Sequence, residues 1–185
     1  DHVLGNKKIV KNISTTVSMT SMIDSIVKKY GVNCFRTKVG FKYVAPNMEK
    51  NDSILGGEES GGYSYSKHLL ERDGIISSML ILENLIESKS NSSEFIYKLS
   101  EKYGNYFYRR SDIKLNDKTV KKLTDFISKF NSKKIIDKQI KFIDKKDGIK
   151  INFENDEWIL VRLSGTEPLA RIYAESFDKE SVNNL

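Results

Sequence analysis

The sequence predicts an α/β domain with a mixed, mainly parallel sheet, followed by a small α+β domain with an antiparallel sheet. Two observations lead to this prediction. In the first half, short β-branched runs alternate with amphipathic helical patterns, which is typical of βαβ units. In the second half, one helical pattern precedes four short strand-like runs that are separated by turn residues. We expect residues 1–104 to form the first domain and residues 105–185 the second.

The first domain is expected to begin with a strand over residues 8–17, which are rich in Ile and Val. A helix follows over residues 22–30, because apolar residues recur there at helical spacing and Gly31 stands where a left-handed C-terminal cap belongs. Further strands are expected over residues 33–39 and from Ser53. Strand, helix and strand with short links predict parallel pairing.

Two later helices of this domain are marked by their caps. Asp73 precedes a long segment rich in Ile and Leu, whose broad apolar face is expected to pack on the sheet. Asn91 and Glu94 match a capping box for the next helix, which Gly104 is expected to end.

The second domain is expected to start with an extended crossover over residues 105–115 and a helix over residues 117–130. The Asp-Gly pair at 147–148 and the Asn-Asp pair at 155–156 are typical of hairpin turns. The expected strands and the final helix cover residues 139–143, 148–153, 157–161, 170–175 and 178–185.

Composition narrows the class of protein. The chain has 185 residues, of which 38% are hydrophobic and 30% charged, and this composition is typical of a folded globular protein. The net charge is +6, but the basic residues are interleaved with 25 acidic ones, so we expect small anionic ligands and no nucleic acid. No apolar run approaches the roughly 20 residues of a membrane helix, and we expect no membrane partner.

Cys34 is the single cysteine, so an internal disulfide is excluded and a cytoplasmic location is expected. We expect this side chain to be a small buried residue. His68 has no second histidine nearby, and we interpret it as a structural or surface residue. The first residue is not Met, so we expect that the chain is cut from a longer protein or trimmed at its start.

The segment RLSGTEP over residues 162–168 lies between two apolar strand-like runs, and an arginine follows shortly after it. Guanidinium groups fit phosphate or carboxylate oxygens bidentately, and a glycine lets the backbone approach a ligand closely. The alternative is a polar hairpin turn with solvated arginines. The residues that would form the anion site are Arg162, Ser164, Gly165, Thr166 and Arg171.

The segment GGEESGG over residues 56–62 places two carboxylates and a hydroxyl among four glycines. Carboxylates accept hydrogen bonds from vicinal hydroxyls, so Glu58 and Ser60 are candidates for sugar binding. Paired acids could also bind a metal or act in acid–base chemistry, and the alternative is a flexible acidic turn. Lys42 either presents its ammonium to a ligand from a strand end or is a surface lysine on a short helix.

Three segments together resemble motifs of the α-D-phosphohexomutase family of phosphoglucomutases and phosphomannomutases. Residues 56–62 resemble its sugar-binding loop, residues 162–168 its phosphate-binding loop, and residues 37–42 the segment with its active-site lysine. The segments follow the family's order at about its spacing, and the resemblance covers nearly the whole chain.

This resemblance implies that residues 1–104 are the third of four domains and bind sugar. Residues 105–185 would be the fourth, truncated at its end, with a TATA-box-binding-protein-like fold that binds phosphate. Sugar hydroxyls would bind to Glu58 and Ser60, with Lys42 near a phosphate. The non-transferring phosphate would bind to Arg162, Ser164, Gly165, Thr166 and Arg171.

The resemblance also implies an isomerase and phosphoprotein that interconverts hexose 1-phosphate and hexose 6-phosphate through a phosphoserine. Hexose 1,6-bisphosphate would be its intermediate and activator, and Mg²⁺ its cofactor. The family's Ser-His-Asn-Pro type and Asp-Gly-Asp-Gly-Asp-Arg type loops do not occur in this sequence. We therefore expect no catalytic residue and no metal ligand in this chain, no activity from it alone, and the missing N-terminal domains as its partners.

The phosphosugar is left open by these patterns. Phosphoglucosamine mutase and phosphopentomutase are alternatives of the same class, and a free-standing phosphosugar-binding module is an alternative of another class.

Overall fold

In the computed structural model the described residues are 1–135, 137–165 and 167–185. They form two compact units, Asp1–Asn105 and Tyr106–Leu185. The elements of the first unit are α1 (His2–Gly5), β1 (Asn12–Thr16), α2 (Met22–Tyr30), β2 (Cys34–Thr37), α3 (Phe41–Lys50), β3 (Ser53–Gly57), β4 (Tyr63–Tyr65), α4 (Gly74–Glu87) and α5 (Ser92–Tyr103).

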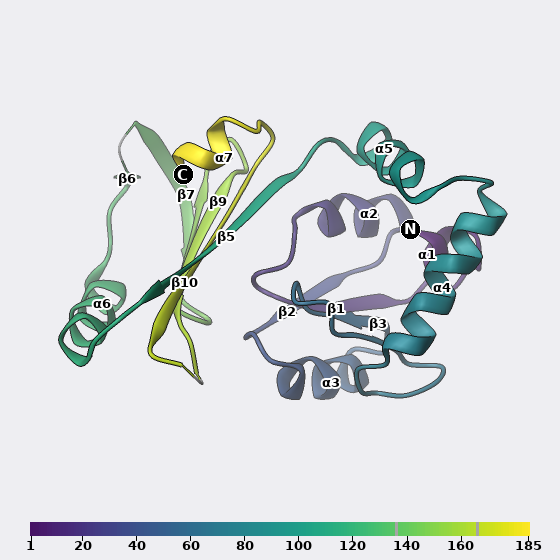
Figure 1. Ribbon diagram of the computed structural model, residues 1–185, viewed down its shortest axis with the longest axis horizontal. Helices are drawn as coiled ribbons and strands as arrows, with labels where there is room; N and C mark the ends of the chain where they lie inside the picture. Colours follow the sequence, from purple (N-terminus) through teal and green to yellow (C-terminus); the bar gives the residue numbers. More distant parts are fainter. Residues whose placement is uncertain (136, 166) are drawn as a thin grey trace. The chain divides into compact units, whose positions relative to one another are not determined.

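The sheet of the first unit has the strand order β2-β1-β3-β4. Strand β1 is parallel to both β2 and β3, whereas β4 is antiparallel to β3. Helices α2 and α3 lie on opposite faces of this sheet (Figure 1). The predicted mixed, mainly parallel sheet is thus confirmed, and the carboxyl ends of three parallel strands meet at one edge.

Local sequence signals explain the boundaries of these helices. Gly31 ends α2 in the left-handed conformation, with a φ of 65°. The Asp73 carboxylate caps α4 by accepting hydrogen bonds from two backbone N–H groups of its first turn. The predicted capping box of Asn91 and Glu94 is present at the start of α5.

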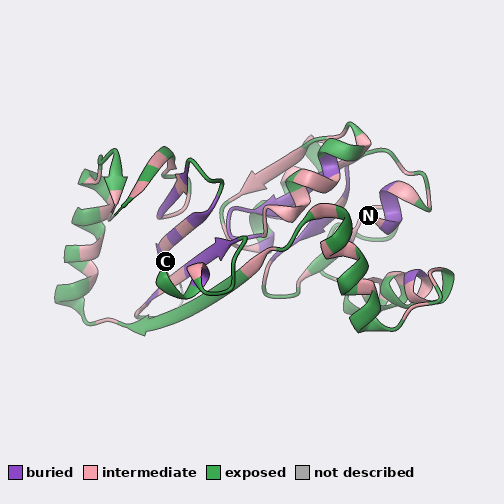
Figure 2. Cartoon of the chain, turned by 90° about the horizontal axis from the view of Figure 1, so that it is seen from above, coloured by how far each residue is buried: buried purple, intermediate pink, exposed green. Residues whose placement is uncertain are grey.

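In the first unit the structure decides between two alternatives for Lys42 and contradicts one expectation. Helix α3 runs past Pro46 to Lys50, so Lys42 lies on a helix and not at the end of a strand. The apolar residues of α4 are distributed around the whole helix, and only one side reaches the core, where Leu80 packs. The opposite side is exposed, with Ile75 at 76% and Ile86 at 67% of full exposure. Figure 2 shows long buried stretches in strands of both units.

The second unit is an antiparallel sheet with the strand order β5-β10-β9-β8-β7-β6. Ile127 and Phe130 from the helical segment pack against a core formed by Ile149, Ile151 and Phe153. The elements are β5 (Phe107–Lys114), α6 (Asp117–Lys129), β6 (Lys134–Ile135), β7 (Lys138–Asp144), β8 (Ile149–Phe153), β9 (Trp158–Leu163), β10 (Leu169–Ser176) and α7 (Ser181–Asn184).

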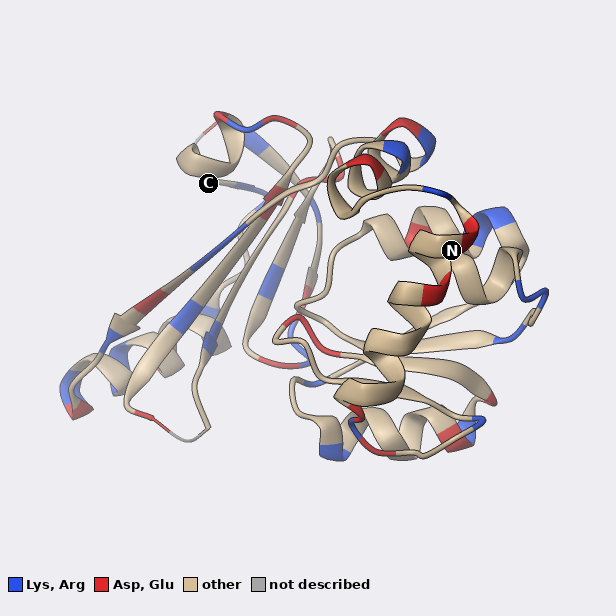
Figure 3. Ribbon diagram, turned by 45° about the vertical axis from the view of Figure 1, so that its right-hand side comes forward, with Lys and Arg blue, Asp and Glu red and all other residues tan. Residues whose placement is uncertain are grey.

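The expected α+β domain with an antiparallel sheet is therefore confirmed, although the segment expected to be a crossover is a strand. Strand β5 pairs with β10 along its whole length and so adds an edge strand to the sheet. Acidic and basic residues alternate along the chain in both units, as the red and blue ribbon segments in Figure 3 show. Among the described helices, none has the length and apolar character needed to cross a membrane.

Close packing of α3 on the sheet predicts the effect of one substitution. A Cβ atom at Gly56 would lie 2.2 Å from Met48 Sδ and 3.0 Å from Val44 Cγ1, and both of these side chains are fully buried. We expect Gly56→Ala to lower the free energy of unfolding by about 1–3 kcal/mol. Gly74→Ala is the control, because nothing lies within 4 Å of a Cβ at that position. Equal urea midpoints for the two variants would contradict the close approach.

Candidate functional site

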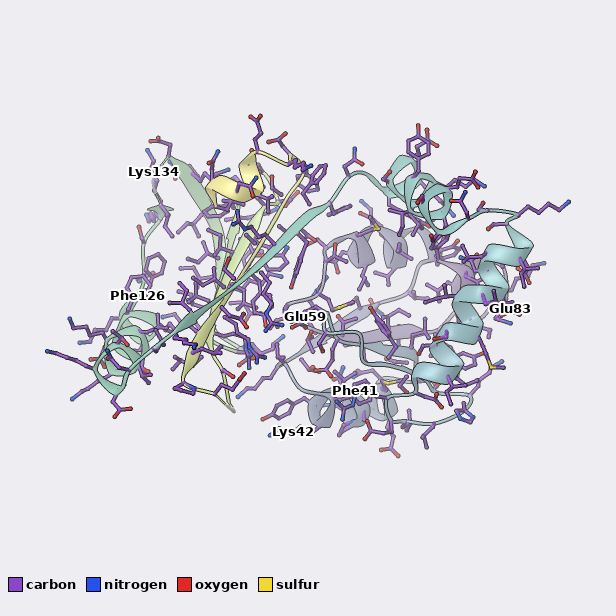
Figure 4. The ribbon with its side chains drawn as sticks, in the orientation of Figure 1. Phe41, Lys42, Glu59, Glu83, Phe126 and Lys134 are labelled. Atoms are coloured by element: carbon purple, nitrogen blue, oxygen red, sulfur yellow. The ribbon has the colours of Figure 1, made fainter. Side chains whose placement is uncertain are left out.

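The shared edge of the parallel strands carries the polar loop of the first unit. Strand β3 ends at Gly57 and continues directly into Glu58 and Glu59, while the segments that follow β1 and β2 leave the sheet at the same edge. Figure 4 shows Glu59 at this edge of the unit and Lys42 at the start of α3. In open α/β sheets this edge is where ligands bind.

Glu58 is buried, with 5% of its surface exposed. Its Oε1 accepts a hydrogen bond of 2.9 Å from the backbone N–H of Gly40, the residue that precedes α3. Burial is the main cause that raises the pKa of Glu58 above its usual value, and the Gly40 hydrogen bond partly offsets this effect. This hydrogen bond joins the acidic loop to the helix that carries Lys42.

Glu59 holds the loop to the end of β1. Its Oε2 accepts hydrogen bonds of 2.6 Å from Ser18 Oγ and 3.3 Å from Thr16 Oγ1, and both hydroxyl groups belong to buried residues. The sequence analysis assigned no separate role to this residue. The polar run that ends β1, Ser-Thr-Thr followed by Val-Ser, was the available signal that hydroxyl groups lie at this edge.

The tip of the loop is exposed and turns sharply. Ser60 is exposed, and Gly61 has a φ of 93°, which favours glycine. Gly62 lies so close to Arg72 that an added Cβ would stand 2.7 Å from Arg72 Cδ and 3.2 Å from Glu58 Oε2. Arg72 is a positive charge beside Glu58 that the sequence analysis did not identify.

Lys42 lies in the first turn of α3, where its side chain is exposed. Its Nζ lies 5.1 Å from the centroid of the Tyr43 ring, which is a cation–π contact. The interpretation of Lys42 as a surface lysine on a helix thus describes its position. Gly40, the residue that precedes α3, is hydrogen-bonded to Glu58, so the helix that carries Lys42 begins beside the acidic loop.

In the second unit, Arg162 and Arg171 are directly opposed on the paired strands β9 and β10. Directly opposed residues of an antiparallel pair point to the same face, so two guanidinium groups share one surface. Arg162 is buried, and its Nε donates a hydrogen bond of 3.0 Å to Asp147 Oδ2. Arg171 Nη2 donates to Glu167 Oε2 at 3.1 Å, and its Nε lies 4.0 Å from Asp112 Oδ2.

The hairpin turn at 147–148 positions one of these arginines. Gly148 has a φ of 80°, and a Cβ there would lie 2.7 Å from Arg162 Cβ. The turn therefore packs closely against β9 and places the Asp147 carboxylate beside the guanidinium of Arg162. The sequence analysis predicted this turn but not its contact with the arginine.

The connection between β9 and β10 contains the remaining candidates. The backbone N–H of Ser164 donates to Leu169 O at 2.9 Å, and Gly165 is exposed with open space around its Cα. Thr166 lies outside the described residues. In the first unit, Glu58 is thus hydrogen-bonded to the residue that precedes α3, the helix that carries Lys42. In the second unit, Arg162 and Arg171 are directly opposed on β9 and β10.

The structure also shows the surroundings of Cys34, of His68 and of the potential metal ligands. Cys34 is half-buried, not fully buried, and its Sγ lies 3.4 Å from Thr15 Oγ1. His68 is half-exposed and lies 3.1 Å from Asp73 Oδ2, which agrees with a surface residue. Among the residues that the structure describes, the one cluster with metal-ligand spacing is His2, Glu83 and Glu87, none of which belongs to either candidate loop.

Comparison with known proteins identifies the family. Residues 1–103 match the phosphoglucomutase/phosphomannomutase α/β/α domain III, and residues 112–185 match the phosphoglucomutase/phosphomannomutase C-terminal domain. The chain therefore belongs to the phosphoglucomutase/phosphomannomutase family, as the sequence motifs predicted.

Two curated relatives are mutases. The chain is 34% identical over 183 residues to a phosphoglucosamine/phosphogalactosamine mutase of Sulfurisphaera tokodaii, a match that covers 97% of this chain and 38% of the relative. It is 35% identical over 169 residues to a phosphoglucomutase/phosphomannomutase of Thermococcus kodakarensis, covering 91% and 34% of the two chains. The chain thus spans little more than a third of the length of these relatives.

Solved structures share the fold. A phosphoglucomutase/phosphomannomutase family protein from Burkholderia thailandensis aligns with a TM-score of 0.73 at 21% identity, over 99% of this chain and 37% of that one. An N-acetylphosphoglucosamine mutase from Aspergillus fumigatus, in complex with GlcNAc-6P and magnesium, aligns with a TM-score of 0.57 at 15% identity. That match covers 96% of this chain and 40% of the other.

The raised pKa of Glu58 predicts a pH-dependent stability effect. Because this pKa is higher in the folded than in the unfolded chain, ionisation of Glu58 opposes folding, and the full cost is present above the folded pKa. We expect Glu58→Gln to raise the urea midpoint at pH 7. The gain should shrink as pH falls through the folded pKa towards the usual value of 4.5.

The matched control for this measurement is Glu49→Gln, which neutralises an exposed carboxylate on α3. We expect little change in its midpoint at any pH. A Glu58→Gln midpoint that equals or falls below the wild-type value at pH 7 would show that the buried carboxylate is not destabilising.

Proposed function

We propose that this chain is the substrate-binding C-terminal half of a phosphohexomutase that interconverts hexose 1-phosphate and hexose 6-phosphate. The observation that carries the proposal is the opposed pair of arginines on β9 and β10. Nε of Arg171 is buried and has no hydrogen-bond partner among the described residues. A buried guanidinium donor without a partner is costly, and a phosphate oxygen would satisfy it.

The arginine pair suits the phosphate that does not react. A phosphate dianion between Arg162 and Arg171 would offset the repulsion of the two like charges, and a guanidinium binds phosphate through two parallel hydrogen bonds. The turn that follows β9 would add the Ser164 hydroxyl and backbone N–H groups near Gly165. Thr166 completes the proposed set from its position in the sequence.

The first unit would bind the sugar ring. Glu58 directs one carboxylate oxygen at the Gly40 N–H, and its second oxygen is available to adjacent sugar hydroxyls. Ser60, exposed at the loop tip, would donate to or accept from the same sugar. Lys42 would supply positive charge near a phosphate from the first turn of α3.

The reaction makes two demands on these residues. A hexose 1,6-bisphosphate formed on the enzyme must turn round before its second phosphate is removed, so the anchor must accept either phosphate. A pair of guanidinium groups recognises the phosphate and not the carbon that bears it, which satisfies this demand. The sugar-binding carboxylate must accept hydroxyls in both orientations, and an ionised carboxylate can do so because both of its oxygens accept hydrogen bonds.

The groups that transfer phosphate would lie outside this chain. The sequence has no Asp-x-Asp-x-Asp run, and the histidine-containing cluster on α1 and α4 does not suit Mg²⁺, which prefers six oxygen ligands. When bound elsewhere in the protein, Mg²⁺ would stabilise negative charge on the transferring phosphoryl group. The chain's own residues would hold the substrate in place.

The proposed substrate is a hexose phosphate, and the names of the two relatives point to two kinds of sugar, with and without an amino group. The Sulfurisphaera relative acts on amino sugars by its name, and the Thermococcus relative is a phosphoglucomutase/phosphomannomutase. The acidic residues Glu58 and Glu59 would favour a protonated amine on the sugar, so we infer that glucosamine phosphates are accepted beside glucose phosphates.

Calorimetric titration tests the phosphate anchor. We expect the 185-residue chain to bind glucose 1-phosphate, and Arg162→Ala or Arg171→Ala to weaken binding by at least about tenfold, because a charged hydrogen-bond partner is lost. Binding should also weaken as salt concentration rises. Arg109→Ala is the matched control, since this exposed arginine on β5 contacts Asn183 and not the anchor. Equal loss in all three variants would contradict the assignment.

An activity assay tests whether the groups that transfer phosphate lie outside this chain. We expect the chain alone to show no conversion of glucose 1-phosphate to glucose 6-phosphate, because it lacks a phosphoserine loop. The measurement is a coupled assay for glucose 6-phosphate, with a full-length family member as the positive control. Turnover that persists after further purification would overturn the proposal that the reacting groups lie elsewhere.

A further inference from the structure

Three potential metal ligands from α1 and α4 converge in the first unit. His2 comes from the short helix α1, and Glu83 and Glu87 lie one turn apart on the same face of α4. One ring nitrogen of His2 and one carboxylate oxygen from each glutamate lie within 4.8 Å of one another. Figure 4 shows Glu83 on α4, the helix whose outer surface is exposed.

The His2 imidazole is buried, and its two ring nitrogens face different carboxylates. Only 8% of His2 is exposed, and its Nε2 lies 3.1 Å from Glu83 Oε2. Its Nδ1 is buried and has no hydrogen-bond partner within the described part of the chain, and it lies 3.7 Å from Glu87 Oε2. A metal cation bound between this ring nitrogen and the Glu87 carboxylate would satisfy both groups.

Neighbouring side chains orient the two carboxylates. Lys7 Nζ donates a hydrogen bond of 2.6 Å to Glu83 Oε1, which leaves Oε2 directed at the imidazole. Asn6 Nδ2 donates to Glu87 Oε2 at 3.1 Å. Partners of this kind fix the geometry of metal ligands and increase their affinity. Lys7 also offsets part of the negative charge, so a single divalent ion would be sufficient.

We propose that His2, Glu83 and Glu87 bind a Zn²⁺ ion that joins α1 to α4. One imidazole and two carboxylates match the nitrogen and oxygen ligands of zinc, and a water would complete four-coordinate geometry. Mg²⁺ and Ca²⁺ prefer more ligands, all of them oxygen. The proposed role of the ion is structural, since it links the short helix α1 to the long helix α4. Of the residues of α4, Asn84 is the one that is buried. This site shares no residue with the sugar or phosphate sites and does not depend on the proposed function.

Zinc titration of the 185-residue chain without a histidine tag tests the site. All proteins carry Cys34→Ser, which removes the chain's single thiol as a competing ligand. We expect one Zn²⁺ per chain in calorimetry and a higher melting temperature with Zn²⁺ than without it. His2→Gln and Glu87→Gln should each weaken Zn²⁺ binding by at least about tenfold and abolish the thermal shift.

The controls remove the same chemical groups elsewhere. His68→Gln removes the other histidine, and Glu49→Gln removes an exposed carboxylate on α3, and both should bind Zn²⁺ as the parent does. Glu87 is half-exposed, so its variant should fold even if His2→Gln does not. Absence of a thermal shift in the parent, unchanged Zn²⁺ binding by Glu87→Gln, or an equal shift with Mg²⁺ would each overturn the proposal.

Discussion

Two like charges on one surface are the constraint that organises the second unit. Arg162 and Arg171 occupy directly opposed positions of β9 and β10, an arrangement that is destabilising for like charges. Asp147 offsets one charge through a hydrogen bond, and Glu167 offsets the other. Both arginines therefore have carboxylate neighbours, but one buried guanidinium donor, Nε of Arg171, has no hydrogen-bond partner among the described residues.

The Arg171 donor without a hydrogen-bond partner has a consequence for binding. A phosphate that entered between the arginines would satisfy the free donor, and it would compete with Glu167 for the exposed side of Arg171. Asp147 would keep Arg162 oriented throughout, because Gly148 holds the hairpin turn against β9. The first unit follows the same principle, since Glu59 is fixed by Thr16 and Ser18 while the carboxylate of Glu58 is less engaged. In each unit, hydrogen bonds fix one charged residue (Arg162 or Glu59), and we propose that a second one (Arg171 or Glu58) binds the substrate.

Much of the fold could be predicted because local signals determine it. The caps at Asp73 and Asn91 and the glycine at position 31 act within one helical turn, so the sequence contains them in full. The family motifs likewise fall within short loops. The course of α3 past Pro46 could not be predicted in this way, because packing on the sheet compensates for the hydrogen bond that proline cannot make.

Other features depend on contacts between distant residues. The exposed side of α4 was expected to be buried, since an apolar helix pattern does not reveal how many sides will find a partner. Asp147 and Arg72 lie beside site residues only in the folded chain, so the sequence did not reveal these contacts, although the turn that contains Asp147 was predicted. The His2 cluster joins residues about 80 positions apart, and only the spacing of Glu83 and Glu87 was visible in the sequence.

The central claim is that the arginine pair binds the phosphate of a phosphosugar, and the arginine side-chain resonances report on it directly. The measurement is an NMR titration of the Nε–Hε signals of Arg162 and Arg171 with glucose 1-phosphate, and with glucose as the uncharged control. The account predicts that both signals shift together with one dissociation constant, and that glucose moves neither. If both signals stay fixed while other residues shift, or if each saturates at a different concentration, the pair is not a phosphate anchor.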